Sequence, residues 1–162
     1  MSFSPLVEFL ASQRAESILR LDSLRSELIY VDEAQKSKLL QRLLERRLAA
    51  IVGSHDRGKT KTACSVGLDW RHDVYYGTAP ELHPRSVFAQ VEGFHDAIRA
   101  NTLFILDDAD QAPHVASEII EWFYTNSQCA LLVVSRPLFS SEADESTAPL
   151  ADLLSEPAAV NL

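Results

Sequence analysis

Short apolar runs alternate with segments of helical periodicity from residue 48 onward, and this alternation leaves the chain few possible folds. A strand whose residues are all apolar must be covered on both faces, as happens when parallel strands are joined by helices packed on either side. Four such runs occur, at residues 48–52, 74–76, 102–106 and 129–134. Residues 158–162, at the end of the sequence, could begin a fifth. The sequence therefore predicts an α/β fold with a mainly parallel sheet.

Apolar residues three or four positions apart mark the helices around these runs. We predict helices over residues 59–68, 84–100, 113–126 and 149–154. Before residue 48 the same spacing recurs in two segments, 5–29 and 33–46. We therefore expect residues 1–47 to form a helical N-terminal extension and residues 48–162 to form the α/β domain.

The composition is that of a globular domain with an acidic balance. The chain has 23 Asp and Glu against 15 Lys and Arg, a net charge of −8. This charge argues against a protein that coats nucleic acid, although it does not exclude every contact with nucleic acid. No run approaches the roughly 18 apolar residues that span a bilayer, so we expect no membrane contact. The N-terminus lacks the basic start of a signal peptide. Cys64 and Cys129 lie in apolar segments, which indicates buried thiols in a reducing compartment, the cytoplasm.

Residues 53–60 match G-x-x-x-x-G-K-[ST] in full, between a predicted strand and a predicted helix. In such a loop backbone N–H groups surround a phosphate, which requires glycine where the chain approaches the anion closely. The helix that follows adds the partial positive charge of its N-terminus. Lys59 would reach the β- and γ-phosphates, and the Thr60 hydroxyl would bind Mg²⁺. The predicted nucleotide-binding residues are Gly53, Ser54, His55, Asp56, Arg57, Gly58, Lys59, Thr60 and Lys61.

Two carboxylates follow the apolar run at 102–106. Asp107 and Asp108 would lie at the C-terminal edge of the sheet, where open α/β folds bind ligands. We predict that Asp107, with Thr60, orients the Mg²⁺ shell and that Asp108 positions the attacking water. Aspartate also caps helices after strands, so a structural role is the alternative, and Asp110 is expected to be an exposed or capping residue.

A third polar group ends the run at 129–134, in the segment Ser135-Arg136-Pro137. A guanidinium at this edge is able to contact the γ-phosphate and so respond to its presence. A surface arginine after a strand is the alternative. The predicted catalytic residues are Lys59, Asp108 and Arg136, and the predicted metal-binding residues are Thr60 and Asp107.

Taken in order, the loop and the two polar strand ends resemble the additional-strand (ASCE) class of P-loop NTPases. Within that class residues 48–162 are similar to the STAND ATPases, the relatives of NACHT and NB-ARC domains, and more distantly to AAA-type ATPases. The resemblance implies a P-loop NTPase three-layer sandwich that binds ATP and Mg²⁺, with Asp107 at the Walker B position and Arg136 at sensor 1. It also implies that the Walker B and sensor strands lie beside the loop strand, with residues 74–76 at an edge.

Three features depart from the family pattern. Asp56 places a carboxylate inside a loop that binds phosphates, so it must point outward or weaken binding. Asp108 stands where AAA-type proteins have glutamate, which implies slow hydrolysis. The sequence stops at the expected fifth strand, so we expect an N-terminal fragment of a longer protein, with a minimal domain as the alternative.

Two functions fit this pattern. The first is a Mg²⁺-dependent ATPase, a STAND-like switch whose N-terminal helices bind a protein partner or a second copy. The second is a nucleotide-binding regulatory module without useful hydrolysis. No Asn-Lys-x-Asp segment for reading guanine occurs in the chain, and the preference for ATP comes from the resemblance alone.

Overall fold

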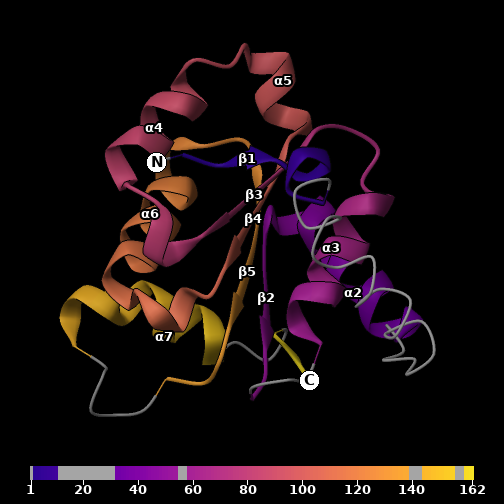
Figure 1. Ribbon diagram of the computed structural model, residues 1–162, viewed down its shortest axis with the longest axis vertical. Helices are drawn as coiled ribbons and strands as arrows, with labels where there is room; N and C mark the ends of the chain where they lie inside the picture. Colours follow the sequence, from indigo (N-terminus) through magenta and orange to yellow (C-terminus); the bar gives the residue numbers. More distant parts are fainter. Residues whose placement is uncertain (1, 11–31, 55–57, 139–143, 156–158) are drawn as a thin grey trace.

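A computed structural model describes residues 2–10, 32–54, 58–138, 144–155 and 159–162. It shows a six-stranded sheet with helices on both faces, a P-loop-like three-layer sandwich (Figure 1). The strand order is β1-β3-β4-β5-β2-β6, and every neighbouring pair is parallel except β1 with β3. The strands span Ser4–Pro5 (β1), Leu48–Val52 (β2), Val74–Thr78 (β3), Leu103–Asp107 (β4), Ala130–Ser135 (β5) and Val160–Asn161 (β6). The predicted α/β fold with a mainly parallel sheet is confirmed.

The residues of the central strands alternate between two apolar cores, one on each face of the sheet. In β4 every residue is buried, with Leu103 and Ile105 in one core and Phe104 and Leu106 in the other. Burying a side chain of this size contributes about 1.5–3 kcal/mol. Burial on both faces is why these strands are wholly apolar in sequence.

The helices form two layers, one on each side of the sheet (Figure 1). Helices α2 and α3 and the helical residues 6–10 pack on one face, and α4, α6 and α7 pack on the other. The helices span Glu33–Arg46 (α2), Lys59–Asp69 (α3), Pro84–Glu92 (α4), Asp96–Asn101 (α5), Pro113–Asn126 (α6) and Ala148–Ser155 (α7). None of the helices in the described ranges is long and apolar enough to cross a membrane.

Helix α2 shows how the local sequence sets the ends of an element. It begins after Asp32, whose side chain accepts hydrogen bonds from the backbone N–H groups of Ala34 and Gln35. It ends at Arg47, which takes the left-handed conformation with φ 62°. Its buried leucines, Leu39 and Leu43, attach it to the sheet.

The predicted single helix over residues 84–100 is wrong. The structure has two helices, α4 and α5, separated by residues 93–95. The break lets Phe94 pack against the rings of Tyr75 and Phe104. The Arg99 side chain holds this turn by donating hydrogen bonds to the carbonyl oxygens of Phe94 and Glu92. A tertiary contact of the aromatic side chain therefore interrupts the helical periodicity.

Strand β1 corrects the expected place of β3. Because β1 pairs antiparallel with β3, with Ser4 opposite Tyr76, the segment 74–76 is not the outermost strand. The expected neighbours of the loop strand are half right, since β5 lies beside β2 but β4 lies one strand further away. The predicted helix over 5–29 falls mostly on residues outside the described ranges. The division at residue 47 stays a prediction, and α2 packs on the sheet as an integral layer.

Candidate functional site

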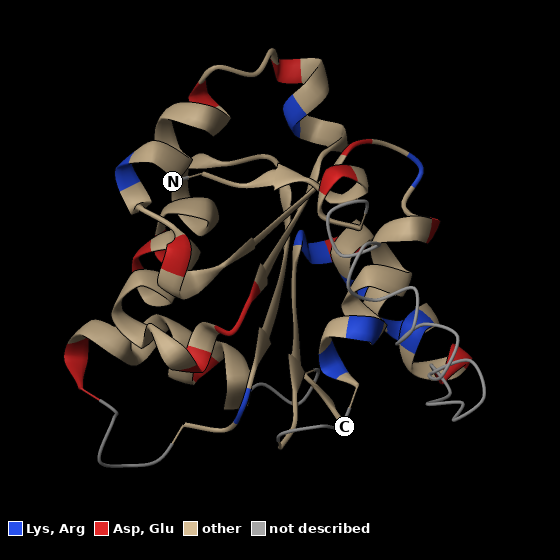
Figure 2. Ribbon diagram, viewed as in Figure 1, with Lys and Arg blue, Asp and Glu red and all other residues tan. Residues whose placement is uncertain are grey.

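Most of the predicted site residues that the structure describes lie at one edge of the sheet. Strands β2, β5 and β4 are adjacent and parallel, so their carboxyl ends lie at the same edge. Figure 2 shows acidic residues at the end of β4, and basic residues at the start of α3 and just after β5. The segments that meet here include Lys59 and Thr60, Asp107 and Asp108, and Arg136.

The loop between β2 and α3 has the glycine geometry that its motif requires. Gly58 has φ 74°, a left-handed conformation that side chains rarely adopt, and it precedes α3 without any side-chain cap. At Gly53 an added Cβ would lie 2.8 Å from the backbone oxygen of Leu162. The three residues between, His55, Asp56 and Arg57, lie outside the described part of the chain. That Asp56 either points outward or weakens phosphate binding therefore stays a prediction.

The lysine of the motif folds back over its own loop. Lys59 Nζ donates a hydrogen bond of 2.7 Å to the backbone oxygen of Ser54. This contact places the ammonium group beside the residue that follows Gly53. Lys61, two residues further along α3, is partly buried, and within the described ranges it makes no hydrogen bond or ion pair with the other predicted site residues.

Asp107 is the most enclosed carboxylate of the site, at 3% exposure. Its Oδ2 accepts hydrogen bonds from Thr60 Oγ1 at 2.7 Å and from the Tyr76 hydroxyl at 2.5 Å, and its Oδ1 accepts from the Asp108 N–H at 2.8 Å. Burying a charge is costly unless hydrogen bonds compensate it. Three donors supply that compensation here, so the ionised side chain is held in one orientation.

The oxygen atoms of Thr60 and Asp107 fit a hydrated divalent cation. Because the Thr60 hydroxyl gives its single proton to Asp107, the lone pairs of Thr60 Oγ1 are left for a cation. Mg²⁺ binds oxygen ligands, keeps several of its waters and is commonly held by one or two carboxylates together with phosphates. Thr60 and Asp107 would hold such an ion beside the loop.

Asp108 differs from its neighbour in both backbone and surroundings. It has φ 51°, a left-handed conformation that aspartate tolerates better than most residues, and it makes no side-chain cap to the turn that follows. Partial burial raises the pKa of its carboxyl group, and the negative charges of Asp107 and Asp110 raise it further, against the opposing charges of Arg136 and Lys59. The capping role considered from the sequence is therefore not the one that Asp108 has.

Arg136 lies at the same edge but is held by a carboxylate. Asp110 Oδ1 accepts a hydrogen bond of 3.0 Å from the Arg136 N–H, and Asp110 Oδ2 lies 3.6 Å from Arg136 Nε. The Asp110 side chain is only 15% exposed, whereas the Arg136 side chain is 44% exposed. The sequence expectation of an exposed or capping Asp110 is wrong, because a partner 26 residues away fixes it.

Two residues of this edge were not found from the sequence. Tyr76 is the buried residue of β3, whose other four residues are partly exposed, and only its hydroxyl indicated a polar contact. Asp110 was visible as a third acid after β4, but nothing local indicated its pairing with Arg136. Cys64 of α3 lies near the same carboxylate, and burial, followed by the charge of Asp107, raises the pKa of its thiol to about 12.

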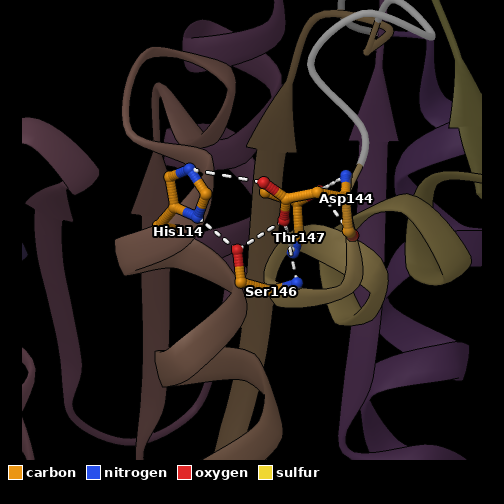
Figure 3. Close-up of polar contacts among 4 residues, drawn as sticks. All are labelled: His114, Asp144, Ser146 and Thr147. Atoms are coloured by element: carbon orange, nitrogen blue, oxygen red, sulfur yellow. Dashed lines mark hydrogen bonds and ion pairs between the residues drawn. The ribbon is translucent and has the colours of Figure 1, made fainter.

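A second polar cluster joins α6 to the turn before α7 (Figure 3). His114 Nδ1 contacts Ser146 Oγ at 2.5 Å, and Ser146 Oγ donates to Asp144 Oδ1. Asp144 also caps the turn through the backbone N–H groups of Ser146 and Thr147. In a nucleophilic triad the carboxylate orients the histidine from the nitrogen opposite the serine. Here Asp144 binds the serine itself and lies 4.0 Å from His114 Nε2, so the cluster is a structural link.

No family model and no curated protein matches the sequence. Among solved structures, the chain is similar to PCH-2 from C. elegans, with a TM-score of 0.42 and 16% sequence identity. The matched region covers 86% of this chain and 44% of the PCH-2 chain, so the chain spans less than half of that protein's length.

Proposed function

We propose that this chain is a Mg²⁺-dependent module that binds and hydrolyses ATP and works as a molecular switch of the STAND type. The observation that carries the proposal is the 2.7 Å contact between Thr60 and Asp107. It joins the last residue of a complete phosphate-loop motif to a carboxylate 47 residues away, at the end of β4, a parallel strand separated from the loop strand β2 by β5. The mutual position of these two groups supports a cation held beside a bound phosphate.

Each residue has a distinct role in this proposal. The loop and the uncapped start of α3 bind the phosphates through backbone N–H groups. Lys59 leaves Ser54 to contact the β- and γ-phosphates. Thr60 and Asp107 would hold Mg²⁺, which when bound would withdraw charge from the phosphate oxygens. Asp108 would accept a proton from the attacking water as the water oxygen bonds to the γ-phosphorus. The bond from that phosphorus to the β,γ-bridging oxygen would break at the same time, with ADP as the leaving group. The raised pKa of the Asp108 carboxyl group favours this proton transfer.

Arg136 supplies the response of the switch. Its guanidinium exchanges Asp110 for the γ-phosphate when the triphosphate is present, so the segment after β5 differs between the ATP and ADP states. The N-terminal helices pass that difference to a protein partner or a second copy, in the cytoplasm. Nucleic acid and membrane are not needed as partners.

A regulatory module that binds nucleotide without useful hydrolysis is the second candidate. It is favoured by the pairing of Arg136 with Asp110, which keeps the arginine on a carboxylate of its own chain. In that case occupancy alone would stabilise the fold, by mass action.

Nucleotide titration and phosphate release test the two candidates together. Lys59→Ala should weaken ATP binding by about tenfold or more, which corresponds to about 1.4 kcal/mol. Lys38→Ala, which removes an exposed lysine from α2, should leave binding unchanged. If the two variants bind ATP equally well, both candidates fail. If ATP binds but neither the wild type nor Asp108→Asn releases phosphate, the regulatory candidate replaces the ATPase. If phosphate is released and Asp108→Asn does not change its rate, the role proposed for Asp108 fails.

A further inference from the structure

We propose that Tyr76 is a positioning residue for the metal-binding carboxylate, and that the N-terminal residues 3–10 set its position. The inference rests on the proposed function, because it concerns how Asp107 meets Mg²⁺. It assigns a role to β3 and to residues 3–10, neither of which belongs to the sequence motifs of the site. The carrying observation is the 2.5 Å hydrogen bond from the Tyr76 hydroxyl to Asp107 Oδ2.

The hydrogen bonds of Asp107 determine which of its acceptor positions stays open. An ionised carboxylate has about four lone-pair positions, two on each oxygen. On Oδ2 both are taken, one by Thr60 and one by Tyr76, and on Oδ1 one is taken by the Asp108 N–H. A single position on Oδ1 is left for a water of the Mg²⁺ shell. The Tyr76 hydroxyl thus prevents the carboxylate from offering Oδ2 instead.

Tyr76 is itself held from the N-terminal side. Its ring stacks on the ring of Phe9, with centroids 3.9 Å apart and planes at 19°. Its backbone lies opposite Ser4 in the antiparallel pair of β1 with β3. The side chain is 6% exposed, so these contacts and the core around α3 leave the ring one position. Residues 4 and 9 therefore contact Tyr76 by backbone and by side chain.

The connection runs from Phe9 through Tyr76 to Asp107 and ends at the predicted metal site. A partner that displaced the N-terminal segment would release the Tyr76 ring and with it the fixed orientation of the carboxylate. Outer partners of metal ligands commonly change metal affinity by about 10- to 100-fold when they are removed. We expect the same range here.

The test measures the affinity of a fluorescent ATP analogue as a function of free Mg²⁺, and again in EDTA. Tyr76→Phe keeps the ring and removes only the hydroxyl. It should raise the Mg²⁺ concentration at half-effect by about tenfold or more, while the affinity in EDTA stays within about twofold of wild type. Tyr75→Phe is the matched control, because Tyr75 lies on the same strand but packs on the opposite core.

Phe9→Leu keeps the hydrogen bond and removes the stack, so it provides a second variant should Tyr76→Phe fold poorly. It should shift the Mg²⁺ dependence in the same direction by a smaller factor, and the double variant should shift it no more than Tyr76→Phe alone. A Tyr76→Phe titration equal to that of Tyr75→Phe, or an equal loss of affinity in EDTA, would overturn the inference and leave the proposed function standing. Wild-type binding that Mg²⁺ does not affect would instead overturn the proposed function.

Discussion

Replacing Asp107 by asparagine is expected to destabilise the folded protein, whereas the same replacement at the adjacent Asp108 is expected to stabilise it. The two carboxylates are neighbours in sequence and differ in their hydrogen bonds. Asp107 is 3% exposed and accepts three hydrogen bonds from described residues. Asp108 is partly exposed, and its carboxyl group accepts no hydrogen bond from the residues that the structure describes.

The magnitude for Asp107 follows from its three donors. A hydrogen bond to a charged group contributes about 1.5–3 kcal/mol and one between neutral groups about 1 kcal/mol, so neutralising the acceptor loses about 1 kcal/mol at each bond. In the asparagine variant the side-chain oxygen must stay opposite the backbone N–H of Asp108, which can only donate. The NH₂ group of the asparagine then faces the two hydroxyl groups, which are able to rotate and accept from it. Relief of charge burial offsets part of the loss. We expect a net destabilisation of about 2 kcal/mol, or about 4–8 °C in Tm for a domain of this size.

The raised pKa of Asp108 explains why Asp108→Asn is expected to stabilise the folded protein. The folded state disfavours the ionised form, mainly because of partial burial and next because of the charge of Asp107. The contribution of Asp108 to the stability of the folded state is therefore largest below the ordinary pKa of 3.8 and is lost as pH rises through the higher pKa of the folded state. Asparagine removes this penalty at neutral pH and tolerates the φ of 51° equally well. The gain is small, because solvent screens a partly exposed group.

Urea unfolding of the two variants and the wild type, at neutral pH and again near pH 3.5, measures both effects. At neutral pH the midpoints should follow the order Asp108→Asn, wild type, Asp107→Asn. At the lower pH the advantage of Asp108→Asn should shrink. An Asp107→Asn midpoint equal to or above that of the wild type would refute the reasoning, because it would mean that the three donors do not stabilise the charge.

Two further predictions concern the groups around this carboxylate. Asp110→Asn should raise the ratio of ATP to ADP affinity by about two- to fivefold in a competitive titration, because a partly exposed ion pair contributes about 0.5–1 kcal/mol and its loss frees Arg136 for the γ-phosphate; a ratio that does not change would contradict this. Iodoacetamide at pH 8 should label the native protein about 100-fold or more slowly than the unfolded chain, because the pKa of Cys64 is raised to about 12 and burial raises that of Cys129. Fast labelling of the native protein would show that the thiols are accessible.

Much of the fold could be predicted because the strands of a parallel sheet need apolar side chains on both faces. The predicted helix over 113–126 coincides with α6, and the apolar runs fall on β2, β3, β4 and β5. Strand β1 could not be predicted in this way, because two residues carry no periodicity. Its existence depends on Tyr75 and Tyr76, which lie far along the chain.

The motifs located the site, but not the contacts that complete it. The spacing of Lys59 and Thr60 and the position of Asp107 after an apolar run follow from chemistry that the sequence displays. Tyr76 could not be placed, because strand alternation sends Tyr75 and Tyr76 to opposite faces without saying which one reaches a carboxylate. The prediction for Asp110 was wrong for a similar reason. Asp110 follows β4, whereas its partner Arg136 follows β5, and the sequence does not show that the two meet.

The position of β2 within the sheet has a consequence for how the protein folds. Both neighbours of β2, β5 and β6, come later in the sequence, and Leu48 pairs with Leu131. Contacts between residues so far apart form slowly, because the intervening chain must lose its freedom first. During synthesis β2 must wait without a neighbour on either edge until β5 has left the ribosome. A chain shortened before residue 130 would contain the whole phosphate-loop motif and yet have no paired strand from which that loop could start.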